Sequence, residues 1–118
     1  ERLSDSLRRF AEPFEKIAVW GAGHQALTAL CISGVAEKVS FVIDSAPFKQ
    51  GKLTPVTHLP IVPPDFLKTH SVAAILVACA AYNDEIVAFL KENYAERMTI
   101  GILTAAGVET VFENCPRR

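Results

Sequence analysis

The stretch Lys16-Ile17-Ala18-Val19-Trp20-Gly21-Ala22-Gly23-His24-Gln25-Ala26 decides the fold of this chain. A short apolar strand over residues 16–20 leads directly into Gly-x-Gly-x-x-Ala, and a helical pattern follows. Gly21 permits a tight turn, Gly23 lets a ligand approach the backbone, and Ala26 lets the helix pack closely on a sheet. The first N–H groups of such a helix attract anions. The stretch therefore predicts an α/β domain that binds a phosphate-bearing ligand.

Strands and helices alternate along the rest of the chain. The expected elements are a helix over 22–33, strands over 39–43 and 59–62, a short helix over 65–68, a buried strand over 72–79, a helix from 83 or 84 to 94, and strands over 98–103 and 108–112. This alternation predicts the α/β class, as a Rossmann-like three-layer domain. Its sheet is mostly parallel, with about five strands and helices on both faces.

An amphipathic segment precedes the first strand. Leu3, Leu7, Phe10 and Phe14 recur at helical spacing, and Pro13 ends the helix. We therefore divide the chain into a leading amphipathic helix, residues 1–14, and a Rossmann-like domain, residues 15–115. The apolar stripe of the helix either docks against a neighbouring domain or covers an edge of its own sheet.

Composition excludes several classes of protein. The net charge of −1 and the pI near 6.3 argue against binding of nucleic acid. The longest apolar run, residues 72–82, is too short to span a bilayer, so no membrane partner is expected. Residues 1–15 are charged and amphipathic, unlike a signal peptide. We therefore expect a cytoplasmic protein.

The cysteines indicate neither a metal site nor disulfide bonds. Cys31, Cys79 and Cys115 match no zinc-binding spacing. Free cysteines are commonly buried, so we expect Cys31 and Cys79 to be small core residues. Cys115 lies near the C-terminus and is expected to be a free thiol.

Polar residues follow several of the predicted strands. Asp44 stands 44 − 21 = 23 positions after Gly21, where an acidic side chain accepts hydrogen bonds from a ribose. Ligands of open α/β sheets bind beyond the carboxyl ends of the strands. The residues expected at this edge are Gly21, Ala22, Gly23, His24, Asp44, Lys49, Gln50, Gly51, Lys52, Tyr82 and Asn83. The alternative is that the glycines only make a turn, while Asp44 and the two lysines are solvated.

The sequence provides little for catalysis. There is no Gly-x-Ser-x-Gly elbow, and no Cys/His pair follows from the spacing. His24, His58 and His70 do not form a metal-binding pattern. Asp84 and Glu85 stand at a helix start, where acidic side chains favour the helix dipole. We therefore predict a binding edge, with no catalytic residue and no metal ligand.

Residues 17–23 and the segment Val42-Ile43-Asp44-Ser45-Ala46-Pro47-Phe48-Lys49-Gln50-Gly51-Lys52-Leu53-Thr54-Pro55 together resemble a known family. This family is the C-terminal domain of S-adenosylmethionine-dependent C-methyltransferases, whose nearest well-understood members act on nucleotide-linked deoxysugars. Thr57-His58-Leu59-Pro60-Ile61, Pro64 and residues 83–86 fit as well, so the likeness covers about residues 15–112. Members commonly have Gly at the position of Val56, and many carry Trp-Asn where this chain reads Tyr82-Asn83.

The resemblance implies a role within a larger enzyme. It implies that this domain binds the substrate, for which a nucleotide-linked sugar is expected, and that it is not catalytic alone. It adds Thr57 and His58 to the expected substrate contacts. It also implies that no cofactor binds here, because S-adenosylmethionine and zinc belong to the upstream part of the parent. That upstream methyltransferase domain is then the expected partner, and the absence of an initiator Met agrees with an excised domain.

Two other functions remain open. Gly21, Gly23, Ala26 and Asp44 also fit an NAD(P)-binding domain, although the long Pro-rich loop after Asp44 does not favour it. A non-catalytic interaction module that docks through the leading helix is the other alternative.

Overall fold

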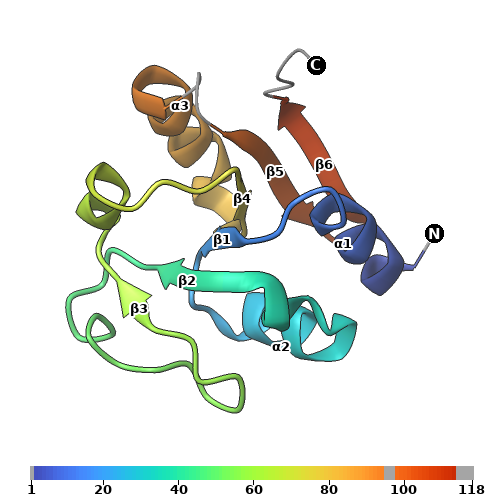
Figure 1. Ribbon diagram of the computed structural model, residues 1–118, viewed down its shortest axis with the longest axis horizontal. Coiled ribbons are helices and arrows are strands. Elements are labelled where there is room, and N and C mark those ends of the chain that lie inside the picture. The colour runs from blue at the N-terminus through green and yellow to red at the C-terminus, as the bar shows by residue number, and fades with distance from the viewer. Residues whose placement is uncertain (1, 95–97, 114–118) are drawn as a thin grey trace.

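Six strands form one mixed sheet in the computed structural model, which describes residues 2–94 and 98–113 (Figure 1). The strands are β1 Ile17–Trp20, β2 Val39–Ile43, β3 Ile61–Val62, β4 Ala74–Val77, β5 Thr99–Thr104 and β6 Gly107–Phe112. Their order is β3-β2-β1-β4-β5-β6, with β6 antiparallel to β5 and every other pair parallel. The structure confirms the predicted α/β class and its mostly parallel sheet.

Helical segments cover both faces of this sheet. They are α1 Leu3–Ala11, α2 His24–Ser33 and α3 Asn83–Tyr94, with short 3-10 helices η1 Val35–Lys38, η2 Pro64–Lys68 and η3 Ala80–Tyr82. Alternate residues of β1 point to opposite faces. Ile17 and Val19 pack in a core with α1 and α2, whereas Ala18 and Trp20 pack in a second core with η2 and α3. The result is the three-layer arrangement expected from the sequence.

The leading helix belongs to this fold. Figure 1 shows α1 beside β6, and Leu7 and Ala11 are each only 1% exposed. The Ser6 hydroxyl accepts a hydrogen bond of 2.8 Å from the Val108 N–H. A Cβ added to Gly101 would lie 2.6 Å from the ring of Phe10, so helix and sheet are in direct contact. The apolar stripe therefore packs on its own sheet, with Leu7 fully buried and Leu3, Phe10 and Phe14 partly buried.

A change in direction of the chain lies at the carboxyl end of β1. From β1 the chain passes through α2 to β2 on one side and later returns to β4 on the other. The Gly21 N–H donates to the Ile43 carbonyl at 2.7 Å, and the Ala78 N–H donates to the Trp20 carbonyl at 2.9 Å. These bonds bring the ends of three strands together, at the place where ligands bind in open α/β sheets.

The long segment 45–60, here called the β2–β3 loop, folds back along β3. The Gly51 N–H donates to the Ile61 carbonyl at 2.9 Å, and the Ile61 N–H donates to the Lys52 carbonyl at 2.8 Å. Leu53 forms an antiparallel bridge with Pro60. The loop is therefore held by backbone hydrogen bonds over much of its length, although it contains no helix.

Some local expectations need correction. Cys31 is exposed, because α2 turns Ala26, Ala29, Leu30 and Ser33 toward the sheet instead. The strand predicted over 72–79 is shorter: β4 spans Ala74–Val77, and η3 begins at Ala80. Cys115 and the expected domain end at residue 115 lie outside the described residues. In the part of the chain that the structure describes, no helix has the length and apolar character needed to cross a membrane.

Candidate functional site

A cleft of about 790 Å³ opens at the carboxyl ends of β1 and β4. The glycine turn and the first turn of α2 form one wall, the ends of β2 and β4 form the floor, and the end of β5 closes the far side. The lining residues used below are Gly21, Ala22, Gly23, His24, Asp44, Lys49, Cys79 and Asn83. The structure therefore brings three separated segments of the predicted site into one cleft.

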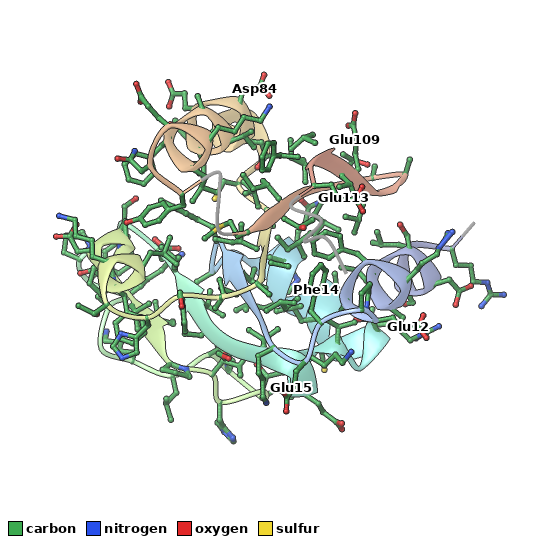
Figure 2. All side chains as sticks on the ribbon, turned by 45° about the horizontal axis from the view of Figure 1, so that its top comes forward. Glu12, Phe14, Glu15, Asp84, Glu109 and Glu113 are labelled. Carbon is green, nitrogen blue, oxygen red and sulfur yellow. The ribbon has the colours of Figure 1, made fainter. Side chains whose placement is uncertain are left out.

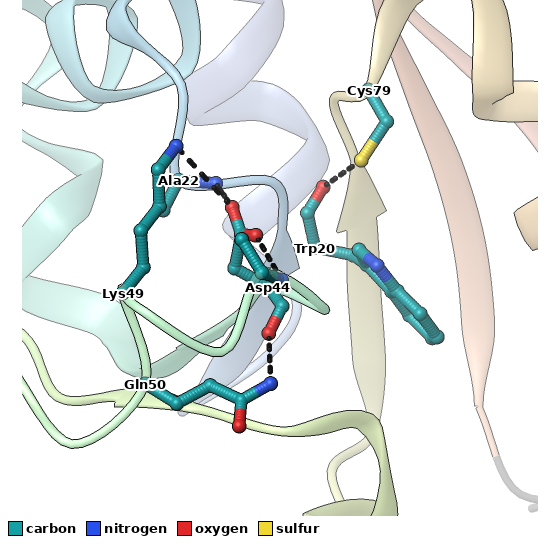
Figure 3. Close-up of polar contacts among 7 residues, drawn as sticks. Trp20, Ala22, Asp44, Lys49, Gln50 and Cys79 are labelled. Atoms are coloured by element: carbon teal, nitrogen blue, oxygen red, sulfur yellow. Dashed lines mark hydrogen bonds and ion pairs between the residues drawn. The ribbon is translucent and has the colours of Figure 1, made fainter.

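Asp44 is the centre of the polar contacts in this cleft (Figure 3). Its Oδ2 accepts a hydrogen bond of 3.1 Å from the Ala22 N–H, and its Oδ1 accepts one of 2.9 Å from the Ala46 N–H. The Lys49 ammonium lies 3.7 Å from Oδ2, and the Gln50 side-chain amide donates to the Asp44 carbonyl at 2.9 Å. The carboxylate thus links the glycine turn to the β2–β3 loop.

This geometry limits what the turn offers to a ligand. The Ala22 N–H donates to Asp44, so a carboxylate already stands where an anion would accept that hydrogen bond. The Asp44 side chain is 16% exposed and the Lys49 side chain 35% exposed, so both still reach the cleft. Each oxygen of a carboxylate accepts two hydrogen bonds, and Asp44 therefore keeps acceptor capacity for ligand hydroxyls.

The two glycines of the turn have different roles. Gly21 has a φ of +128°, and a Cβ there would lie 2.5 Å from the Ala78 carbonyl oxygen. A Cβ on Gly23 would meet nothing within 4 Å, because that position faces the open cleft. The adjoining end of α2 has no side-chain cap and no acidic residue in its first turn, and His24 there is exposed. The positive end of the helix dipole therefore faces the cleft without a protein anion on α2.

Cys79 lines the cleft, whereas the sequence analysis predicted a core residue. Its thiol donates a hydrogen bond of 3.2 Å to the Trp20 carbonyl, and its backbone N–H donates to the Asn83 side-chain oxygen at 2.7 Å. Burial, followed by the nearby negative charge of Asp44, raises the pKa of the Cys79 thiol to about 11. The thiol is therefore protonated near neutral pH. The signal for this position was its place directly after a buried strand.

A second cavity of about 330 Å³ adjoins the cleft. Asp44 and Cys79 line both, and Tyr82, which is 65% exposed, lines the second one. Asn83 and Tyr82, predicted as neighbouring contacts, therefore face different cavities.

The remaining predicted contacts lie in the β2–β3 loop and line neither cavity. Gln50 and Gly51 donate hydrogen bonds to the carbonyls of Asp44 and Ile61, respectively, as described above. The Thr57 hydroxyl is 2.6 Å from that of Thr54, a residue that is only 1% exposed. Lys52 and His58 are exposed on the loop. This part of the predicted site thus serves the structure of the loop more directly than the cleft.

The described residues assemble no set of metal ligands. Within 2–94 and 98–113, no cluster of three or more His, Cys, Asp or Glu side chains could hold a metal ion. Figure 2 shows Glu12, Glu15, Asp84 and Glu109 projecting from separate parts of the periphery. The cleft can accept hydrogen bonds through Asp44 and attract negative charge through Lys49 and the α2 end.

Comparison with known families adds to this geometry. The family model for the C-methyltransferase C-terminal domain matches residues 1–103. The match begins before α1 and ends within β5, so it includes the glycine turn, Asp44 and the β2–β3 loop. A search of curated proteins gives no significant match.

Proposed function

The chain belongs to the C-methyltransferase C-terminal domain family, and on this premise we propose that it binds the substrate of an S-adenosylmethionine-dependent C-methyltransferase. The proposed substrate is a nucleotide-linked sugar, and the domain is not catalytic in isolation. The observation that carries the proposal is the cleft itself, where the Asp44 carboxylate, the Lys49 ammonium and the open end of α2 line one space.

The charges of the cleft suit a diphosphate ester of a sugar. Lys49 and the positive end of the α2 dipole attract phosphate oxygens. Asp44 accepts hydrogen bonds from sugar hydroxyls through the lone pairs that Ala22 and Ala46 leave unused. Gly23 leaves room for a phosphate close to the backbone. These residues bind and orient a substrate, while the proton transfers of methylation are assigned to another domain.

The methyl donor and the zinc ion are assigned to the upstream part of the parent enzyme. For the methyl donor, this proposal rests on the resemblance to the family. The described residues offer no ligand set for zinc. The upstream methyltransferase domain is therefore the proposed partner. A cytoplasmic location is also proposed, since Cys31 and Cys79 are both free thiols.

An NAD(P)-binding domain is the second candidate, favoured by the position of Asp44 after β2. Calorimetry with NAD and NADP tests this alternative. A dissociation constant in the micromolar range would replace the substrate-binding proposal.

Two loop lysines provide a matched test of the proposed function. Lys49 lines the cleft, whereas Lys52, three residues later, does not. Calorimetry of the chain and of the complete methyltransferase with a nucleoside-diphosphate sugar should show binding that Lys49→Ala weakens about tenfold, a typical effect of losing one charged contact. Lys52→Ala should leave the affinity within about twofold. Absence of binding at millimolar ligand in both proteins, or equal effects of the two variants, would contradict the proposal.

A further inference from the structure

The second cavity differs in chemistry from the cleft beside it. Its lining residues are Trp20, Asp44, Ser45, Ala46, Cys79, Tyr82 and Ile86. It contains two aromatic residues and an aliphatic side chain but no Lys, Arg or His. The larger cleft contains Lys49 and His24 but no aromatic ring other than the imidazole. A ligand that spans both cavities would therefore place an uncharged planar group on one side and negative charge on the other.

We propose that the second cavity binds the nucleobase of the substrate, with the sugar of the nucleoside at Asp44 and the phosphates in the larger cleft. This inference rests on the proposed function for the nature of the ligand, and it adds which end of the ligand each cavity receives.

The aromatic walls support a base at this position. Tyr82 is 65% exposed, and its ring makes no ring contact within the described part of the chain. Trp20 is only 7% exposed, and its ring makes an edge contact with the ring of Phe89, with centroids 5.9 Å apart. An unpaired ring at the mouth of a cavity gives a base a face to stack on, and the edge of a fixed indole gives it a floor.

The size and the connection of the cavities support the same assignment. A volume of about 330 Å³ is at the lower end of small-molecule sites and is large enough for a nucleobase. Asp44 and Cys79 line both cavities, so the two spaces meet at these side chains. A carboxylate with spare acceptor sites at the junction matches the hydroxyls of the sugar that joins a base to its phosphates.

Trp20 makes the proposal directly testable, because it is the only tryptophan of the 118 residues. Of the two cavities, it lines only the second one, so its fluorescence reports mainly on that cavity. We expect uridine, thymidine or adenosine to change the fluorescence of the chain, and ribose 5-phosphate, which has no base, to leave it unchanged. The corresponding nucleoside diphosphates should bind more tightly than the nucleosides because of Lys49. A preference for adenosine would assign the cavity to adenine nucleotides rather than to a pyrimidine nucleotide sugar.

Two exposed aromatic residues provide the matched variants. Tyr82→Ala should weaken nucleoside binding about tenfold, as the loss of one stacking partner predicts, whereas Tyr82→Phe should preserve it. Phe48 is 70% exposed and lines neither cavity, but its ring lies 5.9 Å from the Lys49 ammonium, so Phe48→Ala should leave the affinity unchanged for nucleosides, which carry no phosphate. Calorimetric binding of a nucleoside-diphosphate sugar with unchanged fluorescence and no effect of Tyr82→Ala would overturn this inference and leave the proposed function intact. Failure of every nucleoside and nucleotide to bind would overturn both.

Discussion

The glycine turn and the β2–β3 loop both suggest ligand binding in the sequence, but their residues are used differently. At the turn, Gly23 and the start of α2 face open space in the cleft. In the loop, Gln50, Gly51 and Thr57 form hydrogen bonds with other groups of the protein. The comparison shows that a motif can be characteristic of a family because the fold requires it. The less distinctive glycine motif is the one that leaves room for a ligand.

Replacement of the two turn glycines should give the largest contrast. Gly21→Ala places a Cβ against the Ala78 carbonyl at a φ of +128°, and we expect a loss of about 3 kcal/mol or more in the free energy of unfolding. Gly23→Ala has an ordinary φ of −82° and open space, and Ala is only a poorer N-cap of α2 than Gly, so its loss should be about 1 kcal/mol or less. Urea denaturation measures both. Similar losses in the two variants would show that the turn does not divide into a structural and an open glycine.

The burial of Cys79 in the wall of the cleft can be tested through its thiol, whose pKa is about 11 against an ordinary value of 9.0. At pH 8 its thiolate population should be about 100-fold smaller than that of an ordinary thiol, since each pKa unit changes it tenfold. Iodoacetamide should therefore modify Cys79 far more slowly than the exposed Cys31, as measured by mass spectrometry. Variants that retain only one of these two cysteines separate the rates.

The same pKa shift predicts a dependence of stability on pH. The folded state favours the protonated thiol, so the stabilisation is complete below pH 9 and is lost as the pH rises from 9 through about 11. Cys79→Ala should remove that part of the alkaline loss in urea denaturation at a series of pH values. An identical pH profile in the variant would contradict the assignment.

Thr54 tests the internal hydrogen bonds of the loop. It is 1% exposed, and its hydroxyl accepts the Leu59 N–H at 2.8 Å. Thr54→Val keeps the shape but leaves that N–H without its partner, and we expect a loss of about 1–3 kcal/mol in urea denaturation. Thr57→Val, at a less buried hydroxyl, should cost less than about 1 kcal/mol. Equal and small effects would show that the loop does not depend on this pair.

Replacement of Val56 should have the smallest effect, and it should raise the free energy of unfolding. It has a φ of +66° and is 76% exposed, at the position where the resemblance led us to expect Gly. A left-handed conformation costs an L-residue about 1–2 kcal/mol, which exceeds the entropic cost of Gly, about 0.5–1 kcal/mol. Val56→Gly should therefore stabilise the domain by about 0.5–1 kcal/mol, whereas Val56→Ala should gain less. A destabilised Val56→Gly variant would show that the loop is not strained there.

The order of elements and much of the site's position could be read from the sequence. Period-two and helical patterns define strands and helices locally, and parallel strands must place their carboxyl ends at one edge. Gly21 to His24, Asp44, Lys49 and Asn83 therefore meet as expected. The inward face of α2 was less predictable, because small and apolar residues occur all around this helix. In the structure Cys31 is exposed and Ser33 is buried, which the sequence pattern did not indicate.

The sequence by itself determined the α/β class, the glycine turn and the edge of the sheet at which we propose that a ligand binds, because these depend on local periodicity and on the steric freedom of Gly. Tertiary structure alone decided how the polar groups are used. Only the folded chain brings Asp44 to the Ala22 N–H, ties Gln50 and Thr57 into the loop, and places Trp20, Cys79 and Tyr82 around a second cavity. Hydrogen-bond partners far apart in sequence are chosen by distance and direction in space, which no spacing along the chain specifies.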